Sequence, residues 1–230
     1  MTTANKITLT RICMIPFFLY FASQPMLIFS VDASKQGANP ISFPVATIVA
    51  LVLFCVASFT DFLDGYVARK YNQVTDFGKF VDPLADKLLV TSALVLFVGQ
   101  GAMAGWMVCV IIARELIITS LRVVAANKGR VLAATWTGKV KTCVQIGGII
   151  VIYLYYIAIG AMGIDGYALL LQTASRDSFV AEGGMVFAMA DGNMFLTFVG
   201  WVITLVTIYS GYDYLRKNWD IIKDGAVKEK

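Results

Sequence analysis

Six long stretches of mainly apolar residues run through this chain and constrain its fold more than any other feature. They cover residues 12–31, 44–70, 82–99, 102–124, 143–164 and 194–212. A helix that crosses the hydrocarbon core of a bilayer needs about 20 such residues. The pattern therefore predicts an all-α integral membrane protein with six transmembrane helices.

The composition supports this prediction. Of the 230 residues, 58% are hydrophobic and 15% are charged, and the mean hydropathy is +0.74. Soluble proteins have roughly 45–50% apolar and about 25% charged residues. A soluble monomer of this composition would expose large apolar patches. We find no internal repeat and no second domain, so we treat 1–230 as a single membrane domain.

The absence of histidine and the wide spacing of the cysteines exclude several kinds of catalytic and metal-binding site. The chain has no histidine, which excludes histidine bases, phosphohistidine intermediates and histidine metal ligands. The four cysteines, Cys13, Cys55, Cys109 and Cys143, lie in apolar runs without short spacings. We expect them to be buried free thiols and not a disulfide framework or a zinc site.

The first stretch follows Lys6 and Arg11 and so resembles a signal peptide, but no small-residue cleavage site follows it. We expect a membrane helix that Pro16 and Pro25 bend or divide, with part of the N-terminus along the membrane surface.

The basic residues predict the orientation. Of the 19 Lys and Arg residues, fifteen fall on the side of the two termini, two fall on the other side and two lie within stretches. Because basic loops stay in the cytoplasm, both termini are expected to be cytoplasmic. The loops at about 32–43 and 165–193 are then external, and a bacterial cytoplasmic membrane is the expected location.

Four aspartates lie at the cytoplasmic ends of the second and third stretches, where charge is unfavourable and usually functional. They are Asp61, Asp64, Asp82 and Asp86. At about 100° per residue, each helix presents two of them on one stripe. The short connection lets the stripes face each other, and the cleft between them would open to the cytoplasm.

Four carboxylates in one cleft repel each other unless they bind cations. Oxygen ligands without histidine or cysteine favour a hard ion, Mg²⁺ or Mn²⁺. Four carboxylates are enough for two such ions, an arrangement that binds phosphoryl oxygens. Gly65, Ala68 and Gly78 on the same faces leave room for a bulky ligand, and Arg69 supplies a counter-charge for phosphate.

These residues spell D-x₂-D-G-x₂-A-R-x₈-G-x₃-D-x₃-D over residues 61–86. In this motif the chain resembles the CDP-alcohol phosphatidyltransferase family. The resemblance implies that an acceptor hydroxyl attacks the β-phosphorus of a CDP-linked lipid and that CMP leaves. It implies two divalent cations, with Asp61, Asp64, Asp82 and Asp86 as ligands and Asp86 also as general base. It further implies contacts to the CDP-lipid, CDP-diacylglycerol, from Gly65, Arg69, Thr75 and Gly78.

Further segments resemble bacterial family members whose acceptor is glycerol 3-phosphate. Asn5 and Thr8 are similar to residues of an N-terminal segment that lies near the nucleotide. Four basic residues of the fourth and fifth stretches are similar to theirs and would bind the acceptor's phosphate dianion: Arg114, Arg122, Lys139 and Lys141. Taken alone, Lys139 and Lys141 could equally be topology charges. Arg114 lies in an apolar run, and its adjacent acid, Glu115, points about 100° away.

The predicted partners are CDP-diacylglycerol, glycerol 3-phosphate and membrane lipids. The family resemblance favours a homodimer, and we expect no nucleic-acid partner. Two alternatives stay open. One is a related enzyme with another acceptor, such as serine, inositol phosphate or phosphatidylglycerol. The other is a divalent-cation transporter, which the absence of a second acidic site toward the far side disfavours.

Overall fold

The computed structural model describes residues 3–23, 28–30, 42–71, 76–127, 129, 132, 135–161 and 194–220. Within these ranges it describes the backbone alone for the strands and for residues 3–8, 61–71, 76–86, 127, 160 and 161.

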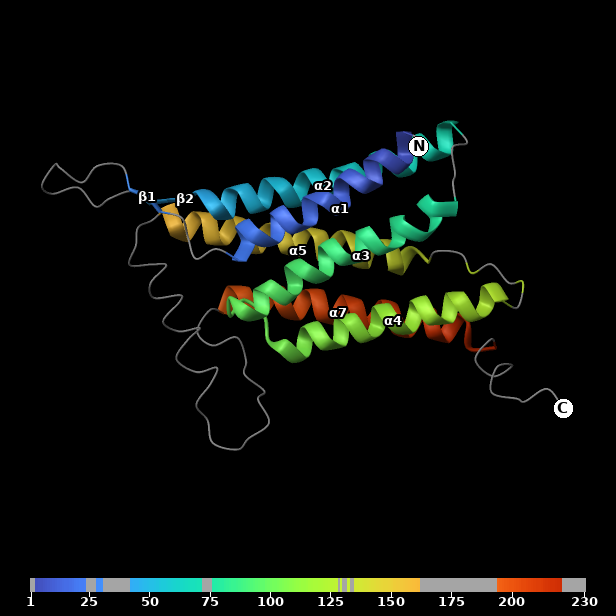
Figure 1. Ribbon diagram of the computed structural model, residues 1–230. Helices are drawn as coiled ribbons and strands as arrows, with labels where there is room; N and C mark the ends of the chain where they lie inside the picture. Colours follow the sequence, from blue (N-terminus) through green and yellow to red (C-terminus); the bar gives the residue numbers. More distant parts are fainter. Residues whose placement is uncertain are drawn as a thin grey trace, which may run out of the picture.

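The described chain forms a bundle of long helices with one small hairpin. The helices are α1 (Thr3–Ser23), α2 (Val45–Tyr71), α3 (Asp76–Gly99), α4 (Gly105–Asn127), α5 (Trp136–Ala161) and α7 (Met194–Lys217). Figure 1 shows them running alternately in opposite directions, with the start of α1, the α2–α3 junction and the end of α7 at one end of the bundle. This arrangement places the aspartate-bearing segments of α2 and α3 at that same end.

Local sequence signals explain several helix ends. Thr135 precedes α5 and its Oγ1 accepts a hydrogen bond from the backbone N–H of Gly138 at 3.2 Å, which caps the helix. After α3, Gly101 has a φ of 70°, and the N–H of Ala102 donates to the carbonyl of Phe97 at 2.9 Å. This left-handed turn closes the helix and favours glycine.

The first apolar stretch differs from its prediction. We expected a helix over 12–31 that Pro16 and Pro25 bend or divide. The helix α1 ends at Ser23, and Ile28–Ser30 is strand β1, which pairs antiparallel with β2 (Ser42–Pro44). The residue before a proline disfavours helical angles, so a helix that reaches Gln24-Pro25 tends to end there. Pro16, by contrast, does not interrupt α1.

The core lies between α1, α2, α3 and α5, and continues to α4 and α7. The ring of Phe18 packs against Phe54 with centroids 5.9 Å apart and against Tyr153 at 6.3 Å, and Tyr153 also contacts Phe97 at 5.0 Å. These four aromatic side chains join α1, α2, α3 and α5. They fix the helices that lead to the aspartate-bearing end.

Small residues let α7 approach its neighbours closely. A Cβ on Gly148 of α5 would lie 2.5 Å from Cδ1 of Ile203, and a Cβ on Gly200 would lie 3.2 Å from Sδ of Met107. A Cβ on Gly211 would lie 3.0 Å from Cγ of Arg114. The glycines therefore bring α7 against α4 and α5 in a way that larger residues would prevent.

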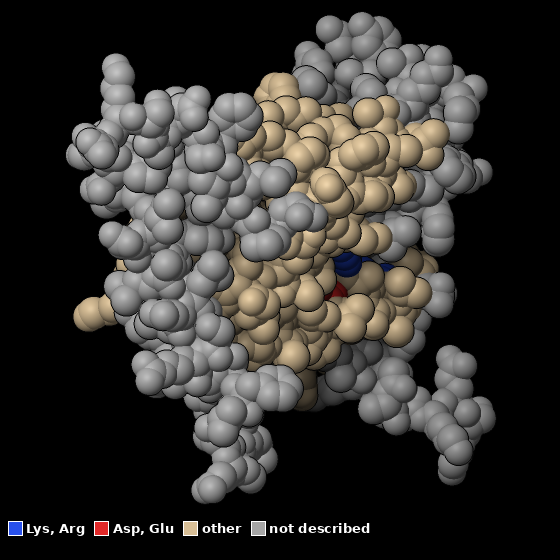
Figure 2. Space-filling view, turned by 60° about the vertical axis from the view of Figure 1, so that its left-hand side comes forward, with Lys and Arg blue, Asp and Glu red and all other residues tan. Residues whose placement is uncertain are grey.

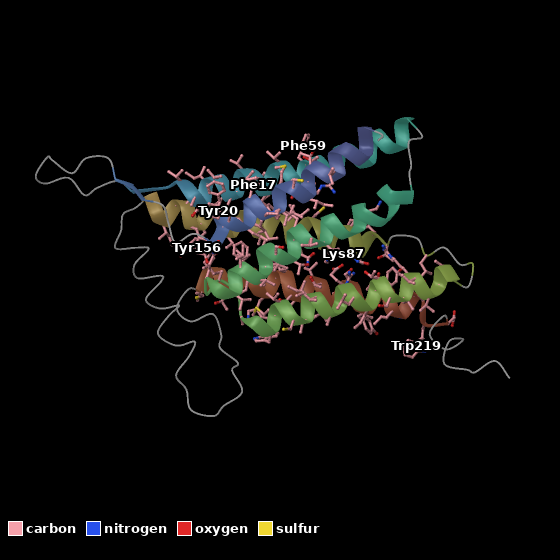
Figure 3. The ribbon with its side chains drawn as sticks, in the orientation of Figure 1. Phe17, Tyr20, Phe59, Lys87, Tyr156 and Trp219 are labelled. Carbon is pink, nitrogen blue, oxygen red and sulfur yellow. The ribbon has the colours of Figure 1, made fainter. Side chains whose placement is uncertain are left out.

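Two helices of the described chain are long and apolar enough to cross a membrane, Trp136–Ile159 and Met194–Lys217. Leu9–Ser23, Val45–Thr60 and Lys87–Gly99 are shorter apolar helical segments. The helix α4 is in neither group, and the charges of Arg114, Glu115 and Arg122 interrupt its apolar sequence. Large apolar side chains also cover the outside of the bundle; Phe17, Tyr20 and Phe59 point away from it (Figure 3) and are 62%, 58% and 61% exposed.

The cysteines correct a prediction. They are free thiols, as expected, but Cys13, Cys109 and Cys143 are exposed and Cys55 is only partly buried. In a bundle whose outer face is apolar, an apolar neighbourhood in the sequence does not distinguish the core from the outer surface.

Candidate functional site

The aspartate motif lies on two helices that pack against each other. Positions 61, 64, 65 and 69 belong to α2, and positions 78, 82 and 86 belong to α3. The backbone is helical through both segments, as the stripe geometry requires. The side chains of these residues, and those of Asn5 and Thr8, lie outside the described part, and Thr75 lies outside the described residues altogether. Their predicted roles stay predictions.

A buried arginine lies at the same level of the bundle. Arg11 is 0% exposed and continues the inward stripe of Ile15 and Phe18 on α1. Seven residues, or about two helical turns, separate Arg11 from Phe18 and position 61 from Phe54. Because Phe18 contacts Phe54 and the two helices are antiparallel, Arg11 is near the level of position 61. From the sequence, Arg11 is expected to be a basic residue of the cytoplasmic side, in the same N-terminal segment as Asn5 and Thr8, and its burial was not predicted.

Several described charged side chains form a second cluster, centred on Glu115 of α4. Its Oε1 accepts hydrogen bonds from Nζ of Lys141 on α5 and, at 3.2 Å, from Nη1 of Arg114. The side chains of Arg114 and Lys141 are 12% and 7% exposed. The adjacent acid does pair with Arg114, although the helical positions are about 100° apart, because the long arginine side chain can turn back toward it.

The cluster connects α4 to three other helices. Nη2 of Arg114 donates to Oγ of Ser210 on α7 at 2.7 Å. Nζ of Lys87 on α3 donates to Oγ1 of Thr119, which itself donates to the backbone carbonyl of Glu115 at 2.7 Å. Figure 3 shows Lys87 between α3 and α4. Three polar residues of α4, Arg114, Glu115 and Thr119, thereby link α4 to α7, α5 and α3.

The other two predicted phosphate ligands lie in different settings. Nε of Arg122 donates to the hydroxyl of Tyr214 at 3.2 Å, and its guanidinium lies 5.5 Å from the centre of that ring. Lys139 is exposed near the start of α5. The structure thus brings Arg114 and Lys141 together on one carboxylate and directs Arg122 to α7.

A pocket opens beside this cluster, between α3, α4 and α5. It encloses about 450 Å³ of empty space, including the solvent at its mouth. Its polar wall is formed by Lys87, Thr91, Glu115, Lys141, Thr142 and Gln145. Its apolar lining is formed by Val90, Leu94, Ile111 and Ile112. In Figure 2, atoms of basic and acidic residues appear together in a hollow, and the surrounding described surface is almost entirely uncharged.

The sequence analysis did not predict Lys87, Glu115 or Gln145 as functional residues. Gln145 is a single polar residue in an apolar stretch, a pattern that helix packing also produces, and Lys87 directly follows the aspartate motif, which drew attention to its carboxylates. Only the packing of three helices places them around one pocket. Among the described residues, no group of three or more Cys, Asp or Glu side chains could hold a metal ion.

Comparison with known proteins identifies the family. The sequence model for CDP-alcohol phosphatidyltransferase matches residues 1–175. The chain therefore belongs to the CDP-alcohol phosphatidyltransferase family.

Curated relatives in bacteria are similar over most of the chain. A protein of Bacillus subtilis (strain 168) named CDP-diacylglycerol–glycerol-3-phosphate 3-phosphatidyltransferase is 40% identical over 219 residues, which are 95% of this chain and 96% of that one. A Cereibacter sphaeroides protein of the same name is 33% identical over 195 residues, 79% of this chain and 86% of its own. A probable phosphatidylglycerophosphate synthase of Mycobacterium tuberculosis is 35% identical over 182 residues, 78% of this chain and 80% of its own.

Proposed function

We propose that this protein transfers the phosphatidyl group of CDP-diacylglycerol to sn-glycerol 3-phosphate, which yields phosphatidylglycerophosphate and CMP. The observation that carries the proposal is the 40% identity, over nearly the whole length of both chains, to a relative named for this reaction. The protein is a phospholipid-synthesising transferase of the family identified above.

The residues fit a divalent-cation site. Asp61 and Asp64 on α2 and Asp82 and Asp86 on α3 offer only oxygen ligands, and the helical segments that carry them lie at the same end of the bundle (Figure 1). These four residues would hold two ions, Mg²⁺ or Mn²⁺. When bound, the ions supply positive charge to the phosphoryl oxygens.

In the proposed reaction, the carboxylate of Asp86 takes the proton of the acceptor hydroxyl. The hydroxyl oxygen then forms a bond to the β-phosphorus, the bond from that phosphorus to the CMP oxygen breaks, and CMP leaves with the electron pair. The chain contains no histidine, so a carboxylate is the suitable base. Asn5, Thr8, Gly65, Arg69, Thr75 and Gly78 are the proposed contacts of the CDP-lipid.

The acceptor's phosphate is proposed to lie near the basic residues of α4 and α5. Lys141 lines the pocket, and Lys139, two residues earlier on α5, is exposed. Arg114 and Arg122, which contact Ser210 and Tyr214, complete the proposed set. Their positive charge suits a dianionic acceptor better than serine or a neutral polyol.

The protein is proposed to lie in the bacterial cytoplasmic membrane with six spans, both termini and the reaction cleft on the cytoplasmic side, and to form a homodimer. The two long apolar helices and the exposed Phe17, Phe59 and Leu116 support a lipid-facing outer surface. The fifteen-to-two distribution of basic residues supports the orientation.

The purified protein in detergent, given CDP-diacylglycerol and Mg²⁺, tests the reaction directly. CMP release should require glycerol 3-phosphate and should stop when EDTA removes the cation. Serine, inositol phosphate and phosphatidylglycerol should each give less than a tenth of that rate. Equal or faster release with one of these acceptors would replace the proposed substrate, and the absence of release with all of them would contradict the reaction.

A further inference from the structure

Gln145 is a buried amide with an unused hydrogen-bond donor. It is 3% exposed, it lines the pocket between α3, α4 and α5, and its Nε2 has no hydrogen-bond partner among the described residues. A buried donor without a partner is unfavourable by roughly 1–3 kcal/mol, so most such groups in proteins are paired. The pocket beside this amide is where a partner would be found.

The walls around Gln145 define what that partner can be. Two lysines, Lys87 and Lys141, face one carboxylate, Glu115, so the charged wall is net positive. Glu115 already accepts from Lys141 and Arg114, which leaves the wall better suited to an anion than to a cation. Beside these charges, Thr91, Thr142 and Gln145 offer hydroxyl and amide groups. A small anion that also carries hydroxyl groups matches both properties.

The apolar side chains that line the pocket limit how many hydroxyl groups the ligand can carry. Val90, Leu94, Ile111 and Ile112 contribute no polar side-chain atoms, so a ring with many hydroxyl groups would leave several of them unpaired. A three-carbon chain with one hydroxyl group near Gln145 would not. Lys87, which lines the pocket, follows the proposed base Asp86 directly in the sequence of α3.

On the basis of the proposed function, we infer that Gln145 is a specificity-determining residue: its Nε2–H donates a hydrogen bond to the hydroxyl of glycerol 3-phosphate that does not react, the one on the middle carbon. Glu115 and Arg114 position Lys141 at the same wall. The residue thus distinguishes a hydroxylated three-carbon acceptor from one without that hydroxyl. A pocket that pairs a buried polar group with a substrate hydroxyl discriminates well against analogues that lack it.

A comparison of two acceptors distinguishes a specific contact of Gln145 with the middle hydroxyl from a purely structural role of Gln145 in the pocket. 3-Hydroxypropyl phosphate keeps the phosphate and the terminal hydroxyl of glycerol 3-phosphate and lacks only the middle hydroxyl. The purified protein should use glycerol 3-phosphate with a kcat/KM about tenfold higher than that of the analogue, a ratio equal to about 1.4 kcal/mol. In Gln145→Met, kcat/KM for glycerol 3-phosphate should fall about tenfold while the value for the analogue stays within twofold, so the ratio approaches one.

Thr207→Val is the matched control. Thr207 is buried on α7, its hydroxyl donates to the carbonyl of Ile203 at 2.7 Å, and it does not line the pocket, so the ratio should stay at the wild-type value. If Gln145→Met does not fold, Gln145→Leu, which also removes the amide donor, should show the same loss of the ratio.

Two results would overturn the inference: an equal fall of kcat/KM for both acceptors, which indicates a structural role, or an unchanged ratio in the folded variant. A wild-type protein that uses neither acceptor would instead contradict the proposed function. The two failures are therefore distinguishable.

Discussion

At the residue scale, one carboxylate organises the described charges of the bundle. Glu115 accepts hydrogen bonds from Lys141 and Arg114, and all three side chains are largely removed from solvent. Two cations without this carboxylate would repel each other where water screens them poorly. Glu115 therefore holds both basic side chains in place.

We predict that Glu115→Gln destabilises the protein by about 3 kcal/mol, since the loss of one partner leaves buried charge uncompensated. For a chain of this size that corresponds to roughly 6–12 °C in Tm, measured by thermal unfolding in detergent. The double variant Glu115→Leu/Lys141→Met should recover part of the lost stability, because it removes Lys141 together with its carboxylate, whereas Arg114 stays buried with Ser210 as its remaining partner. It should stay inactive, because the proposed phosphate ligand Lys141 is absent.

Lys217→Gln is the control for this prediction. The pair between Lys217 and Asp213 spans one helical turn, and the lysine side chain is 57% exposed. Such a surface pair contributes about 0–1 kcal/mol, so Tm should change little. A Glu115→Gln variant as stable as Lys217→Gln would contradict the role assigned to Glu115.

The residues of this cluster mark the limit of prediction from sequence at this scale. The aspartates could be selected as candidates because several charges recur at helical spacing within apolar segments. The pairing of Glu115 with Lys141 could not be predicted from the sequence, because it joins residues 26 positions apart on different helices. The pairing of Glu115 with Arg114 was judged from backbone angles alone, which neglect the reach of an arginine side chain.

At the element scale, two neighbouring glycines of α5 have different surroundings. A Cβ on Gly148 would overlap Ile203 of α7, with 2.5 Å to Cδ1 and 2.8 Å to Cγ1, whereas a Cβ on Gly147 would meet nothing within 4 Å. The close approach of α5 and α7 therefore depends on Gly148 and not on Gly147.

Gly148→Ala should lower stability by about 1–3 kcal/mol, because Ile203 must move out of a packed position. Gly147→Ala should leave stability unchanged or raise it by about 0.5–1 kcal/mol, since alanine favours a helix over glycine. Adding Ile203→Val, which removes Cδ1, should restore part of the loss in Gly148→Ala. Thermal unfolding of the three variants and the wild type checks this, and an equal effect of Gly147→Ala and Gly148→Ala would contradict the packing.

The hydrophobic runs predicted the existence of the helices more accurately than the positions of their ends. The sixth apolar stretch and α7 both begin at residue 194. The hairpin of β1 and β2 was not predicted, because Ile28–Ser30 continues the apolar composition of α1 and its partner Ser42–Pro44 lies beyond a long connection. Composition alone cannot distinguish three apolar residues of a strand from the end of a helix.

At the scale of the whole molecule, many large apolar side chains are exposed on the described surface, and on the face shown in Figure 2 the charged atoms appear in a hollow. This distribution suits a protein embedded in lipid.

Single cysteines introduced into a variant without Cys13, Cys55, Cys109 and Cys143 would test the orientation in intact cells. Because basic residues favour the cytoplasm, cysteines at positions 75 and 138 should react with a membrane-impermeant reagent only after the cells are opened. A cysteine at position 176 should react from outside. Labelling at position 176 only after the cells are opened would contradict the proposed topology.

The central claim is that the aspartates of α2 and α3 drive transfer of a phosphatidyl group to glycerol 3-phosphate. Carboxylates that bind cations and take the proton cannot be replaced by amides, which carry no charge and are not bases at neutral pH. The claim therefore concerns three single exchanges: Asp61→Asn, Asp82→Asn and Asp86→Asn.

The most direct test measures the transfer of radiolabelled glycerol 3-phosphate into the lipid fraction by purified wild type and by each of these variants, at saturating Mg²⁺ and CDP-diacylglycerol. Wild type should form labelled phosphatidylglycerophosphate, and each variant should retain less than about a thousandth of that rate while it elutes as a folded protein. Near-normal transfer by any one of the three variants would contradict the account.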